Sequence, residues 1–264
     1  MEEDKKLKRI DFFLDVLKMV RLLALYFCLY FISIYVFTGT FLREQPKYVA
    51  FLSFAICGIV TFLFLPKDHK KLTFSCEKKG FALLGILLLS AGFTVFMNIA
   101  INYIPWDAFL PEEMQYTSEN TFKIPLYVSI VGYGILAPFA EEVCFRGVLF
   151  KYLKKMIKAP FAIVLSALFF GLYHGNLMQG LYAFIMGLIM GFLVHKTDSI
   201  AASILFHMVS NLIVTLYANI PELYYALYSL PGVIVMGLCV VVGIVLLSIS
   251  FSAKGKEEVK ESEA

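Results

Sequence analysis

Eight apolar segments, each close to the length that crosses a lipid bilayer, constrain the fold of this chain more than any other feature. A helix needs about 20 largely apolar residues to span the hydrocarbon core. The segments that meet or approach this length are 19–39, 48–65, 81–104, 125–145, 160–176, 178–195, 200–219 and 231–252. The pattern predicts an all-α, polytopic membrane protein with about eight transmembrane helices.

The composition agrees with a chain that mostly faces lipid. Hydrophobic residues make up 60% of the sequence and charged residues only 16%, against about 25% charged in soluble domains. The net charge of +3 is too small to indicate a nucleic-acid partner. The five cysteines are scattered without close pairs, so we expect free thiols instead of a disulfide framework.

The chain reads as one domain with charged ends. Residues 1–18 are predicted to be a cytoplasmic segment, followed by a retained anchor, because no small-x-small cleavage site follows the first apolar run. Residues 19–252 form a single transmembrane domain. Residues 253–264 are charged and lack aromatics, and they are predicted to be a disordered cytoplasmic tail.

The basic residues predict the orientation. With eight spans, all of the 23 lysines and arginines except Arg43, Lys47 and Lys123 fall on the side that holds both termini. Because cytoplasmic loops are enriched in Lys and Arg, we expect both termini in the cytoplasm. The opposite side carries the aromatic stretches 106–123 and 220–232, which we interpret as interfacial anchors, with partner recognition as the less favoured alternative.

Polar residues interrupt the apolar pattern at three places. Glu141 and Glu142 lie about 100° apart around a helix, and Arg146 is the i,i+4 neighbour of Glu142. A cytoplasmic helix end explains these three residues equally well. His174 lies one turn after Phe170, and for this lone histidine a packed, hydrogen-bonded side chain is the simpler interpretation.

The third place is the pair of His207 and Asn211, one turn apart in an apolar span, which an interhelical hydrogen bond would explain. The depth of these residues in the membrane favours a shared site over three separate structural explanations. Glu141, His174 and His207 lie roughly 15, 21 and 12 Å from the cytosolic ends of three different helices. The agreement in depth predicts one polar cavity that opens to the cytosol. His69, in a lysine-rich loop, is interpreted as solvated.

In this order the three motifs resemble those of the CAAX-protease and bacteriocin-processing enzyme family (CPBP, or Abi). That family consists of intramembrane endopeptidases related to the type II CAAX prenyl endopeptidases. The resemblance covers residues 141–211 and implies a catalytic core at about 125–219 in a multi-pass protein of a bacterial plasma membrane. The substrate would be a membrane-associated or lipidated peptide or protein, and bacteriocin processing is one such activity.

The resemblance also implies roles for the motif residues. Glu141 would be the general base, and His174 would help to hold the water. His207 and Asn211 would donate hydrogen bonds to the oxyanion, and Glu142 paired with Arg146 would fix the helix. Glu141, His174 and His207 are also an acceptable set of zinc ligands. A metal-free glutamate mechanism fits the same residues, and both possibilities stay open.

Two other classes of function compete with a peptidase. A non-catalytic scaffold or immunity protein could bind another membrane protein through small-residue grooves such as Gly187-x-x-x-Gly191. A transporter could use buried Glu and His as a proton relay, but the sequence shows no internal repeat and no paired broken spans.

Overall fold

The computed structural model describes residues 2–110 and 125–262, and this part of the chain forms a helical bundle without strands. Seven of the described helices are long and apolar enough to cross a membrane. They are Lys6–Thr38, Pro46–Phe64, Lys79–Asn102, Leu126–Met156, Leu177–Thr197, Ile200–Asn219 and Leu230–Ser252. These helices confirm the all-α, polytopic membrane fold.

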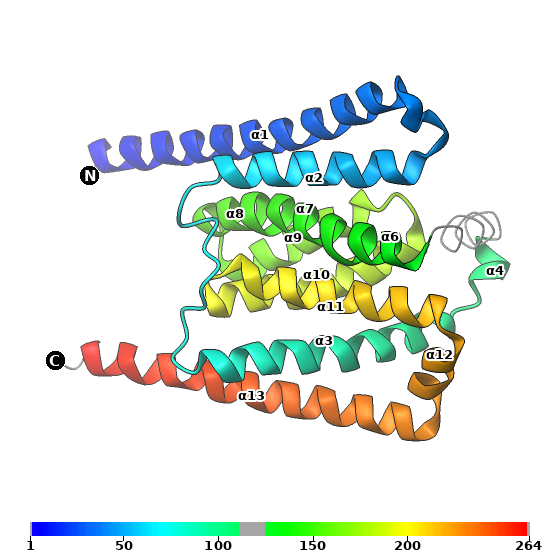
Figure 1. Ribbon diagram of the computed structural model, residues 1–264. Helices are drawn as coiled ribbons and strands as arrows, with labels where there is room; N and C mark the ends of the chain where they lie inside the picture. The colour runs from blue at the N-terminus through cyan, green and yellow to red at the C-terminus, as the bar shows by residue number, and fades with distance from the viewer. Residues whose placement is uncertain (1, 111–124, 263–264) are drawn as a thin grey trace.

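The eighth predicted span is a shorter helix. It covers Ala159–Tyr173, which is 15 residues or about 22 Å, against a hydrocarbon core of about 30 Å. The helix nevertheless carries the chain from one end of the bundle toward the other. Both termini therefore lie at the same end, as the eight-span pattern requires (Figure 1).

Figure 1 shows three layers of helices. The outer layers are the pair α1 (Glu2–Thr38) and α2 (Pro46–Phe64) and the pair α3 (Lys79–Asn102) and α13 (Leu230–Ser262). The middle layer holds the rest of the bundle. Its elements are α6 (Leu126–Val131), η2 (Gly132–Leu136), α7 (Ala137–Glu142), η3 (Val143–Phe150), α8 (Lys151–Met156), α9 (Ala159–Tyr173), α10 (Leu177–Thr197) and α11 (Ile200–Asn219).

The segments predicted outside the spans are helical in the structure at both ends. Helix α1 already begins at Glu2, and α13 continues to Ser262. Residues 253–262, predicted to be a disordered tail, therefore continue a helix. No proline interrupts either stretch, and a helix keeps its backbone hydrogen bonds when it leaves the bilayer.

The aromatic stretches at the opposite end contain short helices. Residues 106–109 form the single-turn helix α4 (Trp106–Phe109), and a short 3₁₀ helix, η1 (Phe41–Glu44), precedes α2. The stretch 220–232 contains α12 (Pro221–Tyr228). Most of the predicted anchor 106–123 lies outside the described residues.

Buried hydroxyl groups join α3 to α11. Ser90 Oγ donates to the carbonyl of Phe206 at 2.6 Å and lies 2.9 Å from Ser210 Oγ. Thr94 Oγ1 lies 2.9 Å from the same Ser210 hydroxyl. Hydrogen bonds of this kind hold helices together in lipid, where apolar surface gives no preference for association. They set the position of α11, which carries two predicted site residues.

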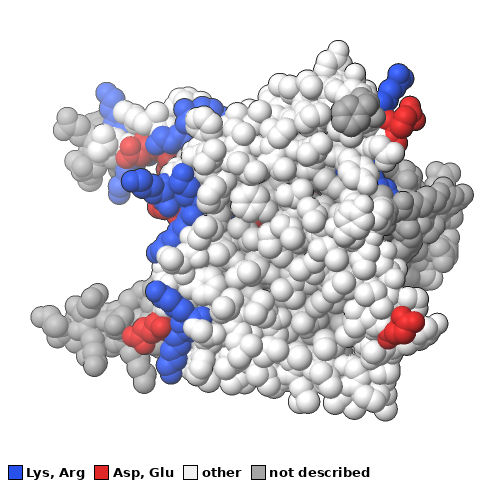
Figure 2. All heavy atoms as spheres, in the orientation of Figure 1, with Lys and Arg blue, Asp and Glu red and all other residues white. Residues whose placement is uncertain are grey.

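The basic end of the bundle is cross-linked by polar contacts. Figure 2 shows lysines and arginines gathered at the end where both termini lie in Figure 1, beside a wide surface without charged side chains. Asp198, in the left-handed conformation after α10, pairs with Lys151 at 2.6 Å and with Lys71 at 3.5 Å. Burial would raise the pKa of Asp198, but the hydrogen bond and charge of Lys151 outweigh it and lower the pKa.

His69 is not the solvated loop residue that the sequence predicts. Its side chain is fully buried, and Nδ1 lies 3.0 Å from the carbonyl oxygen of Gly147 in η3. Burial, aided by the charge of Lys155, lowers the pKa of His69 to about 4. The imidazole is therefore neutral at physiological pH and connects the 65–78 loop to the helix that carries Arg146.

Candidate active site

The helix that carries the two glutamates is widened by two π-helical segments, η2 before α7 and η3 after it. Pro138 explains the first, because it has no N–H for the carbonyl four residues earlier. The N–H of Ala137 donates instead to Gly132, five residues back. Such π turns are rare in proteins as a whole, and those that occur often lie at functional sites.

Asn211 donates a hydrogen bond to the helix that contains the π turn η2. The N–H of Ala137 donates to Gly132, and Pro138 has no N–H. Asn211 Nδ2 donates to the carbonyl of Tyr133, within η2, at 3.0 Å. Because backbone groups in lipid need hydrogen-bond partners inside the protein, Asn211 has a structural role in the bundle.

Glu142 and Arg146 form the predicted i,i+4 ion pair in the interior of the protein. Arg146 Nη1 donates to Glu142 Oε1 at 2.8 Å, and both side chains are 0% exposed. The other terminal nitrogen donates to the carbonyl of Gly187 at 3.2 Å. The guanidinium also lies 4.4 Å from the centre of the Phe170 ring. This burial rules out the alternative that these residues mark a solvated helix end.

His207 lies between the two glutamates. Its Nδ1 is 3.0 Å from Glu142 Oε1, and its Nε2 is 3.8 Å from Glu141 Oε2. Glu141 and His207 are each 7% exposed. Glu142 therefore contacts both Arg146 and His207, and it orients the imidazole toward Glu141. The sequence does not reveal this contact, because the residues are far apart in the chain.

His174 stands at the end of α9, where Gly175 adopts a left-handed conformation with φ +72°. Its Nδ1 lies 2.8 Å from the carbonyl oxygen of Phe170. When Nδ1–H donates to this carbonyl, Nε2 is left as an acceptor. His174 also lies close enough to Glu141 for an electrostatic interaction. The imidazole is half-buried at this end of α9.

The ring of Phe170 joins the two histidines. It meets the ring of His174 edge-on at 4.9 Å between centroids and the ring of His207 at 5.6 Å. Phe145 packs against it at 5.1 Å. In the sequence, Phe170 is notable only because it lies one turn before His174. Its one-turn spacing from His174 is the signal that could have suggested this contact.

Helices from the first half of the chain form a wall of the site. Gly58 in α2 lies so close to Ala140 that an added Cβ would come within 2.9 Å of it. Tyr26 from α1 and Cys57 from α2 belong to the same buried cluster as Cys144. These positions carry no motif, and the sequence did not identify them. All five cysteines are free thiols, as predicted.

The tentative metal ligands are not gathered into a metal site. Among the described residues, no three or more His, Cys, Asp and Glu side chains are placed so that they could hold a metal ion. Nδ1 of His174 and Nδ1 of His207 face Phe170 and Glu142, so Nε2 of each ring is the atom that would have to bind a metal. Glu141, His174 and His207 thus share one region, but their present geometry does not fit a metal.

Fold and site together define a multi-pass membrane protein with a buried centre of carboxylates and imidazoles. Residues 123–213, which include every predicted site residue, match the family model "Type II CAAX prenyl endopeptidase Rce1-like". The chain is also 28% identical over 172 residues to "Putative membrane peptidase YdiL" of Bacillus subtilis (strain 168). That alignment covers 62% of this chain and 69% of the relative. Both matches support the resemblance to the CPBP family.

Proposed function

We propose that the protein is an intramembrane endopeptidase that hydrolyses peptide bonds in a membrane-associated or lipidated peptide or protein. The observation that carries the proposal is the approach of buried Glu141 and His207 and half-buried His174, which come from three helices. Both matches support a membrane peptidase. The family description makes a prenylated C-terminus one candidate substrate, and a bacteriocin precursor is another.

Glu141 is the proposed general base. Peptide hydrolysis needs a water molecule whose proton is removed as its oxygen attacks the carbonyl carbon. The base then passes this proton to the amine nitrogen as the C–N bond breaks, which gives a carboxylic acid and an amine. Glu141 is the carboxylate suited to this task, because Glu142 is already bonded to Arg146 and His207. In the tautomer in which Nδ1–H donates to Phe170, Nε2 of His174 can accept a hydrogen bond from this water.

His207 and Asn211 are the proposed donors to the oxyanion. With Nδ1–H directed at Glu142, a protonated His207 presents Nε2–H to the developing negative charge. Asn211 donates one amide hydrogen to Tyr133 and keeps a second for the oxyanion. Glu142 and Arg146 hold His207 in place and balance its charge.

No step of this sequence passes through a metal, whose part is a separate question. Elemental analysis of the purified protein, compared with Glu141→Gln and His174→Ala, would report metal content independently of activity. We further propose a bacterial plasma membrane as the location, with both termini in the cytoplasm and the catalytic core at about 125–219.

The proposal is tested by comparing peptides from cells that produce wild-type protein with peptides from cells that produce Glu141→Gln. Removing a general base lowers the rate by about 10²–10⁴-fold, so products of this enzyme should disappear from the variant. Glu77→Gln, at an exposed glutamate outside the site, is the matched control and should cleave normally. Unchanged peptides in Glu141→Gln cells at equal protein levels would refute the proposal.

A scaffold that binds another membrane protein is the second candidate. It is favoured by the mutual hydrogen bonding of Glu142, Arg146 and His207, which does not require a substrate. A Glu141→Gln/His207→Gln double variant that still complements a deletion strain would support this candidate over the peptidase.

A further inference from the structure

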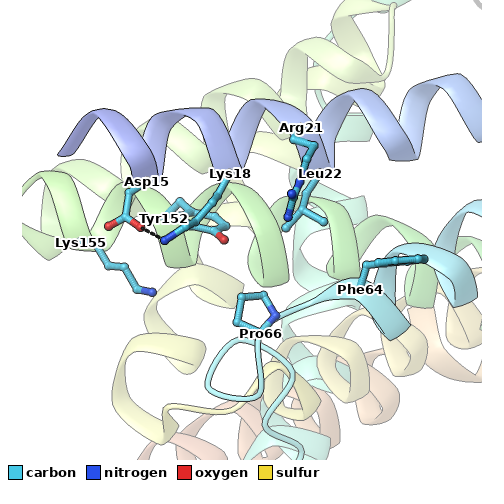
Figure 3. A pocket seen from close by; sticks show the side chains of 8 residues that line it. All are labelled: Asp15, Lys18, Arg21, Leu22, Phe64, Pro66, Tyr152 and Lys155. Carbon is cyan, nitrogen blue, oxygen red and sulfur yellow. Dashed lines mark ion pairs between the residues drawn. The ribbon is translucent and has the colours of Figure 1, made fainter. Parts of the chain in front are cut away.

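A second polar feature lies away from the site, in a hollow of about 360 Å³ at the basic end of the bundle. Helix α1, the end of α2 and helix α8 enclose it, and Figure 3 shows the side chains that they contribute. Three are cations: Lys18 and Arg21 from α1, and Lys155 from α8. Asp15 is the single acid among the lining residues, so the hollow is positively charged.

The cations in this hollow are incompletely neutralised. Lys18 lies 3.7 Å from Asp15, in a pair whose lysine is 52% exposed. Lys155 lies 3.4 Å from Asp68 at the rim and is 41% exposed. Arg21 is exposed and forms no ion pair with any residue in the described ranges, and its side chain extends toward Pro66 (Figure 3). An anion could therefore bind here.

The walls of the hollow are apolar and continue onto the lipid-facing surface. Leu22 and Tyr152 are almost fully buried behind it, and Phe64 is 66% exposed at its edge. Leu17 and Val20, on α1, are about half exposed, at 48% and 52%. The cations lie at the end of the membrane span, and the apolar side chains lie next to them toward the membrane interior. A phospholipid has the same arrangement, with its phosphate at the surface and its acyl chains in the interior.

We propose that this hollow binds the phosphate headgroup of an anionic phospholipid in the leaflet at the basic end. Arg21 and Lys18 would contact the phosphate, with Lys155 on the opposite wall. The acyl chains would lie along Phe64 and the exposed apolar face of α1. The proposed lipid site is independent of the peptidase activity, because none of its residues belongs to the buried centre.

The test is native mass spectrometry of the detergent-purified full chain with phosphatidylglycerol or phosphatidylcholine of identical acyl chains. Wild-type protein should bind phosphatidylglycerol more tightly, and each basic side chain removed should weaken that binding about five-fold. Lys18→Gln/Arg21→Gln should therefore lose the preference. Lys8→Gln/Lys67→Gln removes two exposed charges at the same end, outside the hollow, and should keep it.

Three outcomes would overturn the proposal. Equal binding of the two lipids by the wild type would show that no anionic headgroup is recognised. Equal loss in both double variants would show general charge attraction instead of a site. Displacement of phosphatidylglycerol by millimolar inorganic phosphate would identify a site for the free anion. The charge-conserving variant Lys18→Arg/Arg21→Lys should retain the preference, which separates loss of charge from misfolding.

Discussion

Glu142 is the residue on which the polar contacts of the centre converge. It accepts from Arg146 at 2.8 Å and lies 3.0 Å from Nδ1 of His207. A buried ion pair is a modest source of stability, but removing one partner leaves the other charge buried and uncompensated. The contributions of Glu142 and Arg146 to the free energy of unfolding should therefore be strongly coupled.

This dependence predicts the result of a double-mutant cycle. Glu142→Gln and Arg146→Met should each destabilise the protein by about 3–5 kcal/mol, which lowers Tm by roughly 6–20 °C in a protein of this size. The double variant should lose clearly less than the sum, because neither charge is then left alone. Thermal unfolding in detergent measures all four proteins. Additive losses would show that the ion pair is not a unit.

His69 predicts a pH dependence of stability. Its pKa is lowered to about 4 from the ordinary value of 6.5, so between these values the unfolded chain takes up a proton that the folded protein does not. Stability should therefore fall as the pH is lowered from 6.5 to 4. His69→Asn should reduce this slope of Tm against pH. Equal slopes in the two proteins would show that burial of His69 is not the cause.

At the scale of elements, the π turn η2 links two helices through the proline that creates it. Pro138 has no N–H to donate at the end of η2, and Asn211 on α11 donates to the carbonyl of Tyr133 within this turn. The glutamates follow within one turn of Pro138. Pro138 removes a hydrogen bond from its own helix. The π turn beside it is also the place where Asn211 attaches α11, the helix that carries His207.

This link predicts that Pro138 and Asn211 are energetically coupled. Asn211→Leu should cost about 1–3 kcal/mol, because the hydrogen bond from Asn211 to the Tyr133 carbonyl is lost in the interior of the bundle. In a Pro138→Ala background the cost should be smaller, because the restored N–H can satisfy the helix. Tm values of the two single variants and the double variant give the coupling. An identical cost of Asn211→Leu in both backgrounds would contradict the link.

The elements themselves could largely be predicted from the sequence, and the contacts within the centre could not. Hydropathy places α2 and α11 within about two residues of their observed bounds, because lipid forces backbone groups into helices. The contact of His207 with Glu142 depends on how α11 packs against α7, which no local pattern encodes. The same holds for Phe170 between two histidines, and for the burial of His69 beneath charged neighbours.

At the scale of the whole molecule, both ends of the chain (Figure 1) lie at the end of the bundle where the lysines and arginines gather (Figure 2). The positive-inside rule then predicts that this end faces the cytoplasm. In intact cells, a cysteine introduced at Arg43 should react with an impermeant maleimide, and one introduced at Lys67 should react only after lysis. Cysteine-free protein is the background for both. The reverse pattern would invert the predicted topology.

The central claim is that Glu141 activates a water molecule inside the bundle. Its most direct test uses purified protein in liposomes, a peptide identified by the cellular comparison, and water enriched in ¹⁸O. Wild-type protein should release a fragment whose new carboxyl group carries ¹⁸O, and Glu141→Gln should release it about 10²–10⁴-fold more slowly. Cleavage by Glu141→Gln at the wild-type rate would show that Glu141 is not the general base.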